Sequence, residues 1–281
     1  MGQCFCTLSE STIKVAIKLP HGTKGIFYND SSQSFVECDT NQWLSSLYKE
    51  AVWTGWMVYN DETGHLGDTR TKKGHCKGIV SWNATHISWL VHSVPNFPRV
   101  FSGNTISEIE SSEHIYGQSF AYTQFPYQDT LLMAIIQQVQ LMESNIYIMN
   151  MTSMLPRPPK ITDINTIHLT ETITHFAKPP HFNMDIYEHF PVEFKSTWNV
   201  QTWKRGHPVE SSTSIHDIKE MGYQEHNWSD TQDHSKWGVS QHDWVWVGDL
   251  NRMSSQMHRG GGGFIIKHAG IANAMRLLIK K

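Results

Sequence analysis

Two short stretches pair a histidine with a lysine, and each is suited to chemistry on a phosphodiester. The first is Gly74-His75-Cys76-Lys77-Gly78, and the second is Asp233-His234-Ser235-Lys236-Trp237. Residues i and i+2 of an extended strand point to the same face, so each stretch can aim an imidazole and an ammonium group at one target. The ammonium group would neutralise a phosphoryl oxygen, while the imidazole attacks phosphorus or transfers a proton. The predicted catalytic residues are therefore His75, Lys77, His234 and Lys236.

The two stretches have similar surroundings in the sequence. His92 follows His75 after 17 residues, and Asn251 follows His234 after 17 residues. Each of these later residues closes the return strand of a predicted hairpin. A single histidine–lysine pair is more often a solvated strand edge, but two matched copies favour a catalytic interpretation. They indicate one phosphodiester-binding half used twice, and they predict a pseudo-two-fold arrangement with both pairs facing one cleft.

Two histidines that face each other across a phosphate could cleave it without a metal ion or an organic cofactor. A neutral imidazole would attack phosphorus and form a phosphohistidine, while the opposite imidazolium protonates the leaving oxygen and then activates water. The lysines would stabilise the non-bridging oxygens, where negative charge accumulates in the transition state. Because the two histidines need opposite protonation states, the rate should follow a bell-shaped dependence on pH.

Length and composition indicate a folded protein that becomes cationic in acid. The chain has 281 residues, enough for one large domain or two of ordinary size. A charged fraction of 17% with 39% hydrophobic residues excludes a disordered chain. The formal net charge is −3, and protonation of the 17 histidines would favour a polyanionic partner in an acidic compartment. No apolar run is long enough to span a membrane.

The cysteines and the glycosylation sequons give limited information about the compartment. None of the cysteine spacings resembles a zinc site. Cys76 lies between two predicted catalytic residues, so it should point to the opposite face as a buried apolar side chain and not act as a nucleophile. The first 20 residues contain no apolar segment typical of a signal peptide. Four sequons would suit a secreted glycoprotein, at Asn29, Asn83, Asn150 and Asn227.

Hydrophobic periodicity predicts a chain of strands with few helices. Alternating or β-branched runs indicate strands at 12–19, 52–59, 78–82, 87–92, 116–122, 193–203 and 237–247, with hairpins at 78–92 and 237–247. Residues 130–143 have apolar positions at helical spacing, and a second apolar helix is expected to reach the C-terminus after the glycines at 260–263. Those glycines could form an anion-binding nest or only a flexible loop.

Proline and glycine divide the chain into two parts. Residues 21–41 are rich in turn formers, and residues 153–160 form a proline-rich linker. The linker separates an N-terminal lobe, 1–152, with the first histidine–lysine pair from a C-terminal lobe, 161–281, with the second. Both lobes are expected to form one catalytic unit.

These motifs together resemble the deoxyribonuclease II family of acid endonucleases. The resemblance covers most of the chain, is strongest at 74–120 and 233–263, and is faint between about 125 and 225. The motifs that carry it are Lys18-Leu19-Pro20, residues 74–78, 89–98, 116–119, 233–237, 247–252 and 259–262.

The resemblance implies a fold, an activity and a set of substrate contacts. It implies an α+β or α/β fold, a phospholipase-D-like pseudo-dimer of two similar lobes, each a mixed sheet flanked by helices. It implies metal-independent hydrolysis of double-stranded DNA at acid pH to 3′-phosphate ends, in a lysosomal or secreted protein. By analogy with related phosphodiesterases, His75 would be the attacking histidine. The implied contacts to phosphate and substrate are His92, Gln118, Asn251, Arg252 and Arg259.

Some departures from the family pattern leave alternatives open. Cys76 stands where the family has threonine, and Gly238 stands where it has cysteine, so disulfides in the second half are not expected. This indicates a divergent member, from a reducing compartment or carried by a virus or parasite. A catalytically silent relative that binds DNA or a host protein is one alternative. A phosphodiesterase of the same fold acting on phospholipid is another, but Trp82 and Gln241 stand where its signature has aspartate. A homodimer also remains open.

Overall fold

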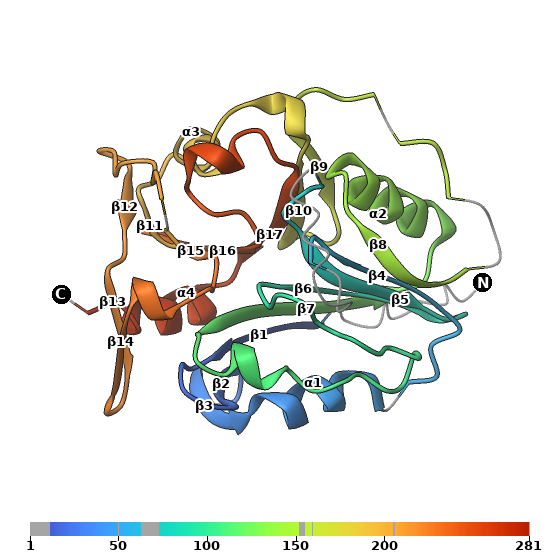
Figure 1. The fold of residues 1–281 in the computed structure, drawn as a ribbon, viewed down its shortest axis with the longest axis horizontal. Helices are drawn as coiled ribbons and strands as arrows, with labels where there is room; N and C mark the ends of the chain where they lie inside the picture. The colour runs from blue at the N-terminus through green and yellow to red at the C-terminus, as the bar shows by residue number, and fades with distance from the viewer. Residues whose placement is uncertain are drawn as a thin grey trace, which may run out of the picture.

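Two β-sheets pack face to face across a shared hydrophobic core (Figure 1). The computed structural model describes residues 12–49, 51–62, 73–151, 155–158, 160–204 and 206–280. Within these ranges, no helix is both long and apolar enough to cross a lipid bilayer.

The first sheet is built from the N-terminal half. Among the described residues it has eight strands, in the order β3-β2-β1-β7-β6-β5-β4-β8. Its strands are β1 (Thr12–Lys18), β2 (Lys24–Asn29), β3 (Ser34–Asp39), β4 (Gly55–Asn60), β5 (Lys77–Trp82), β6 (His86–His92), β7 (Gln118–Pro126) and β8 (Ile146–Asn150). The pairings between neighbours are antiparallel.

The second sheet is built from the C-terminal half. Its order, over the part of the chain that the structure describes, is β12-β11-β15-β16-β17-β10-β9. Its strands are β9 (Asn165–His168), β10 (Ile173–Lys178), β11 (Trp198–Gln201), β12 (Ile215–Asp217), β15 (Trp237–Ser240), β16 (Trp244–Gly248) and β17 (Gly261–Lys267). Here β11 and β12 run parallel and the other pairings are antiparallel. The predicted mixed sheets therefore apply to this half alone, and the fold is of the α+β kind.

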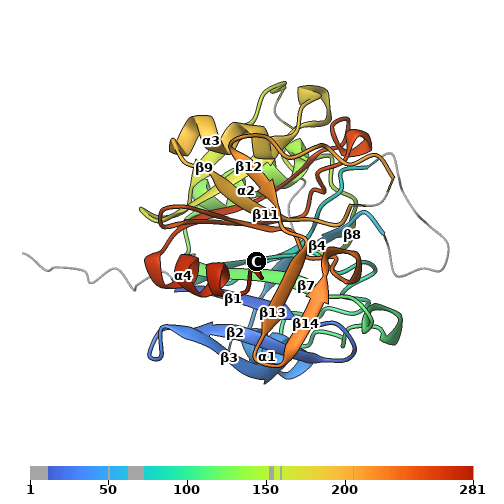
Figure 2. The same ribbon diagram turned by 90° about the vertical axis from the view of Figure 1, so that its left-hand side faces the viewer.

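Helices cover the outer faces and fill the ends of the interface (Figure 1). The outer face of the first sheet packs on α1 (Thr40–Lys49), and that of the second sheet packs on α3 (His189–Phe194). Between the sheets, α2 (Asp129–Leu141) packs beside β9 and β10, while α4 (Ala269–Leu277) packs beside β3, β15 and β16. A small hairpin of β13 (Glu220–Tyr223) and β14 (His226–Ser229) extends toward the first sheet (Figure 2). The Tyr223 hydroxyl donates to the Phe35 carbonyl at 3.1 Å.

Side-chain alternation explains why the predicted hairpins form at these places. Val80 and Trp89 face the core between the sheets, whereas Ile79 and Leu90 face the core under α1. Both faces of β5 and β6 are therefore buried, which fixes their register. The prediction of hairpins at 78–92 and 237–247, of a strand at 12–19 and of a helix at 130–143 is confirmed.

Three of the predicted elements differ at least in part from the structure. The turn-rich region 21–41 contains β2 and β3. The strand predicted at 193–203 begins only at Trp198, because α3 occupies the preceding residues and Lys195 ends it with a φ of 47°. The third is the glycine run, which forms neither a nest nor a flexible loop. Most of it belongs to β17, where neighbouring strands approach so closely that a Cβ atom on Gly262 would lie 2.3 Å from the Phe176 carbonyl oxygen.

The described strands of the first sheet lie within 12–150 and those of the second within 165–267. The linker predicted at 153–160 falls partly outside the described residues. The exact boundary between the lobes therefore stays a prediction.

Candidate active site

One cavity of about 340 Å³ brings the two histidine–lysine pairs together. Each pair lies at the entrance to a strand, with His75 just before β5 and His234 just before β15. Among the residues predicted from the sequence, those that line the cavity are His75, Lys77, His234, Lys236, Asn251 and Arg259. The cavity is also lined by residues that were not among the predicted site residues, which are Asp61, Glu62, Ser93, Pro95, Trp203 and Gln256.

The backbone of each candidate catalytic histidine is bound to the opposite half of the chain. The His75 amide donates to the Gly260 carbonyl at 2.7 Å, and the His234 amide donates to the Gly117 carbonyl at 2.9 Å. Both acceptors need to be glycine, because a Cβ atom would lie 2.0 Å from the Met142 carbonyl oxygen at residue 260 and 2.7 Å from an Asp233 carboxylate oxygen at residue 117. The close approach of the two halves therefore sets where the histidines lie.

His75 is held as a neutral imidazole with a defined tautomer. Its Nδ1 lies 2.5 Å from the backbone carbonyl of Asp249. A carbonyl oxygen can only accept, so Nδ1 carries the hydrogen and Nε2 keeps its lone pair. Burial, followed by the charge of Lys77, holds the pKa of His75 well below its ordinary value. His75 can therefore act as a nucleophile even in acid.

The surroundings of His234 differ from those of His75. Its Nδ1 lies 3.8 Å from Glu113 Oε2. The Tyr116 ring stacks on the imidazole with centroids 3.9 Å apart, and Trp203 meets it edge-on at 4.2 Å. The face of an aromatic ring favours a protonated imidazole. This arrangement suits a general acid.

A buried carboxylate organises the cations on the His75 side. Asp61 accepts a hydrogen bond from Lys77 Nζ and another from Arg259 Nη2 at 2.9 Å, and its Oδ2 lies 3.9 Å from His75 Nε2. Burial alone would raise the pKa of Asp61, but the charges of Lys77 and Arg259 oppose burial and hold the pKa below its ordinary value. Asp61 thus stays ionised in acid and orders Lys77 and Arg259 at the cavity.

Two groups on the other side of the cavity titrate near neutrality. Burial, with a smaller contribution from the charge of Lys77, lowers the pKa of Lys236 to about 7. Burial and the carboxylate of Glu62 raise the pKa of Glu113 to about 7. Both groups therefore bind a proton as the pH falls below about 7, and the cavity then becomes more positive.

The structure places three of the predicted substrate contacts away from the cavity. His92 is buried, and its Nδ1 accepts a hydrogen bond from the Val94 amide at 3.2 Å. Gln118 is buried, and its Oε1 accepts from the Ser93 hydroxyl at 2.5 Å. Arg252 is also buried, and its guanidinium group binds carboxylates of Asp185, Glu188 and Asp217 at 2.9 to 3.2 Å.

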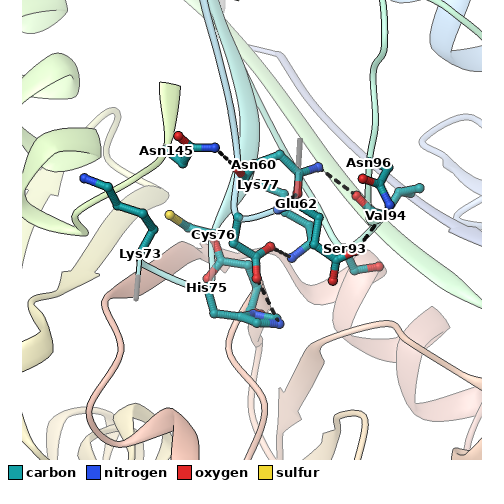
Figure 3. A network of polar contacts seen from close by, with 12 residues as sticks. Asn60, Glu62, Lys73, His75, Cys76, Lys77, Ser93, Val94, Asn96 and Asn145 are labelled. Atoms are coloured by element: carbon teal, nitrogen blue, oxygen red, sulfur yellow. Dashed lines mark hydrogen bonds and ion pairs between the residues drawn. The ribbon is translucent and has the colours of Figure 1, made fainter. Parts of the chain in front are cut away.

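Cys76 has the orientation that strand alternation predicts. The side chain is fully buried in the core between the sheets, and its Sγ lies 2.9 Å from the Ser144 hydroxyl oxygen. Figure 3 shows this sulfur on the opposite side of the chain from the His75 ring. Burial and then the charge of Asp249 raise the pKa of the thiol well above its ordinary value. A thiol with a raised pKa and no access to solvent is not suited to nucleophilic attack.

Asp61 and Glu113 lie beside the two histidines, and the sequence did not reveal them. Asp61 directly follows β4, the strand that pairs with β5 and its histidine–lysine pair. A carboxylate at the end of that strand was the signal that could have identified it. Glu113 lies 121 residues from its partner His234, so no local pattern connects them. Within the described ranges, no group of three or more His, Cys, Asp or Glu side chains could hold a metal ion.

The sequon asparagines all lie in described parts of the chain. Asn150 on β8 and Asn227 on β14 are exposed, whereas Asn29 and Asn83 are partly buried. The amide oxygen of Asn29 accepts from the Ser31 amide at 2.9 Å, and that of Asn83 accepts from the Thr85 amide at 2.9 Å. Glycosylation at these positions stays a prediction.

Comparisons with known proteins agree with the geometry. A model of the deoxyribonuclease II family matches residues 24–281. Deoxyribonuclease-2-beta of Mus musculus is 31% identical over 288 residues, which cover 91% of this chain and 78% of the relative. Deoxyribonuclease-2 of Caenorhabditis elegans is 32% identical and covers 73% of this chain and 60% of the relative. Deoxyribonuclease-2-alpha of Sus scrofa is 27% identical, over 84% of this chain and 72% of the relative. With two histidine–lysine pairs on one cavity and a match over nearly its whole length, this chain belongs to the deoxyribonuclease II family.

Proposed function

We propose that this chain is an endonuclease that hydrolyses phosphodiesters of double-stranded DNA to 3′-phosphate ends, at acid pH and without a metal ion. The observation that carries the proposal is that His75, Lys77, His234 and Lys236 line one cavity. Two imidazoles can divide nucleophilic attack and proton transfer between them, and two ammonium groups can stabilise the phosphoryl oxygens. The lysosomal or secreted location, the homodimer and the glycosylation remain predictions.

In the proposed reaction, His75 attacks and His234 transfers protons. His75 Nε2 forms a bond to phosphorus as the bond from phosphorus to the 5′-oxygen breaks, and His234 gives its proton to that oxygen. In the second step a water oxygen bonds to phosphorus, the N–P bond breaks, and His234 takes the proton of the water. The carbonyl of Asp249 supports this division because it fixes the lone pair of His75 on Nε2.

Matched hydrogen bonds support a phospholipase-D-like pseudo-dimer as the architecture behind this chemistry. The Ser93 amide donates to the Ser119 carbonyl, and the Ser119 amide donates back to the Ser93 hydroxyl at 2.9 Å. The same exchange joins Asp249 and Gly262 in the other half, where the Gly262 amide donates to the Asp249 carboxyl at 2.9 Å. We therefore place one lobe in residues 1–152 and the other in residues 161–281.

The direct test is plasmid nicking at pH 5 with EDTA. We expect the natural chain to nick supercoiled DNA in EDTA, to leave 3′-phosphate ends, and to lose this activity in His234→Ala. Cleavage that EDTA abolishes would contradict the metal-free mechanism. A natural chain that binds DNA but does not cut it would instead identify a catalytically silent relative.

The acid preference is expected to arise partly from substrate binding. At fixed salt, the inactive His75→Ala variant should bind a short DNA duplex more weakly at pH 8 than at pH 5, because Lys236 has lost a proton and Glu113 has become negative. Adding Glu113→Gln should leave binding at pH 5 unchanged and tighten binding at pH 8 by about tenfold, the equivalent of one pKa unit.

A matched control for this measurement is Glu108→Gln, which neutralises an exposed glutamate in the same loop. Its binding should follow the parent at both pH values. If Glu113→Gln binds like the parent at pH 8, the charge of Glu113 does not limit DNA binding.

A further inference from the structure

Two buried lysines occupy matching positions in the two sheets. Lys18 is the last residue of β1 and lies opposite Gln118, where β7 begins. Lys178 is the last residue of β10 and lies opposite Gly261, where β17 begins. Lys18 is 0% exposed and Lys178 is 1% exposed. Neither side chain lines the catalytic cavity.

Each ammonium group binds the backbone carbonyls of the residues four and two positions before the first residue of the partner strand. Lys18 Nζ donates to the His114 carbonyl at 3.0 Å and to the Tyr116 carbonyl at 2.7 Å, and it also binds the Leu19 carbonyl at 3.0 Å. In the other half, Lys178 Nζ donates to the Met257 carbonyl at 2.8 Å and to the Arg259 carbonyl at 2.6 Å.

These contacts cross-link irregular segments that lead into strands. Burying an ammonium group is costly unless its hydrogen-bond donors are satisfied. The carbonyls therefore stabilise the buried lysines, and the lysines in turn satisfy the carbonyls. Burial lowers the pKa of both lysines to about 8, so both are charged in acid.

The segment bound by Lys18 supports His234, which belongs to the opposite half. The residue after Tyr116 is Gly117, whose carbonyl accepts the His234 amide at 2.9 Å. The Tyr116 ring also stacks on the His234 imidazole. Displacement of this segment would thus move both the backbone and the ring of His234.

The segment bound by Lys178 supports His75 in the same way. The residue after Arg259 is Gly260, whose carbonyl accepts the His75 amide at 2.7 Å. The Arg259 side chain binds Asp61, whose carboxylate lies 3.9 Å from His75 Nε2. The first half is therefore arranged around a segment that a lysine of the second half holds.

We propose that Lys18 and Lys178 are positioning residues that act crosswise, with Lys18 setting the geometry of His234 and Lys178 that of His75. The inference rests on the proposed function, in which His234 protonates the leaving oxygen and His75 attacks. It differs from a general stabilising role because each lysine acts on one histidine.

The experiment compares two DNA duplexes that differ at a single cleavage site. One carries an ordinary phosphodiester, and the other carries a 5′-bridging phosphorothiolate, whose thiolate leaves without a proton. In a single turnover with enzyme in excess, Lys18→Met should slow strand cleavage of the ordinary duplex by about tenfold to a hundredfold, the scale of a small misplacement of a catalytic group, and should be much less impaired on the phosphorothiolate. Lys178→Met should be equally impaired on both duplexes.

Exposed lysines on neighbouring stretches of strand provide matched controls, and these are Lys14→Met on β1 and Lys267→Met on β17. Both should cleave like the natural chain. Natural rates in Lys18→Met or Lys178→Met would overturn the proposal, as would equal impairment of Lys18→Met on both duplexes. If either methionine variant does not fold, the arginine variants Lys18→Arg and Lys178→Arg, which keep the charge, are compared on the two duplexes in the same way.

A second measurement separates this inference from the proposed function. If single-turnover strand cleavage by His234→Ala is not rescued by the phosphorothiolate, the assignment of His234 as the acid is wrong. The positioning roles are then judged by NMR of the histidine rings, with the His75 and His234 signals assigned from their loss in the alanine variants. Lys18→Met should shift the His234 ring signals and Lys178→Met those of His75. The reverse pattern, or no shift, would overturn the proposal.

Discussion

Replacing His75 with alanine is expected to reduce DNA cleavage by at least about 10⁴-fold, the scale seen when an enzyme loses its nucleophile. Replacing His234 should cost about 10²- to 10⁴-fold, because the acid and the base for water are lost while the nucleophile remains. On a 5′-bridging phosphorothiolate duplex, His234→Ala should still form the bond between His75 and phosphorus. Hydrolysis of that bond then lacks its base, so the covalent adduct should accumulate.

Labelled DNA and denaturing gels at neutral pH would detect this adduct, which should be released by acid because a phosphorus–nitrogen bond is acid-labile. His242→Ala is a suitable control, since His242 is exposed in the turn between β15 and β16. It should cleave at the natural rate without adduct. An adduct in His75→Ala and none in His234→Ala would reverse the two roles.

The strands next to the histidines could be predicted because local alternation determines them. Both hairpins have apolar residues on two faces, and each histidine–lysine pair stands at the start of its strand. The glycine run was not predictable in the same way. Its extended conformation depends on the proximity of Phe176 and Val247, which are distant in sequence.

The site was predicted only as far as it is local. The four candidate catalytic residues form two pairs with a spacing of two residues, but the carboxyl groups beside the histidines come from elsewhere. Asp61 reaches His75 from the end of β4, and Glu113 reaches His234 from before β7. A resemblance between motifs also does not separate substrate contacts from structural ones. Arg252 lies within a family motif, yet its guanidinium group is directed into the second half and away from the cavity.

Arg252→Met is therefore expected to reduce stability far more than catalysis. The guanidinium group is fully buried and binds Asp185 at 2.9 Å and Asp217 at 3.0 Å. Lys204 lies 3.3 Å from Asp217 and partly replaces the lost charge there, so Asp185 is the main carboxylate left unpaired. Removing one partner of a buried ion pair costs about 3–5 kcal/mol. Urea unfolding at pH 7 should show a loss of this size.

The pH dependence of that loss gives the second part of the test. Burial raises the pKa of Asp185, and the charge of Arg252 opposes the rise. Without Arg252 the pKa of Asp185 in the folded protein should rise further. The stability that such a carboxyl contributes is fully present below its ordinary pKa and is lost as the pH rises toward the raised, folded-state pKa. The deficit of Arg252→Met should thus be smaller at pH 4.5 than at pH 7.

Arg99→Met gives the comparison for an arginine in an exposed ion pair, since Arg99 binds Glu110 at 2.8 Å on the surface. Such pairs contribute at most about 1 kcal/mol. At a temperature where both variants are folded, each should cleave DNA at close to the natural rate. If Arg252→Met unfolds like Arg99→Met but no longer cleaves or binds DNA, then Arg252 contacts the substrate as its family motif suggests, and the buried position would have to open when DNA binds.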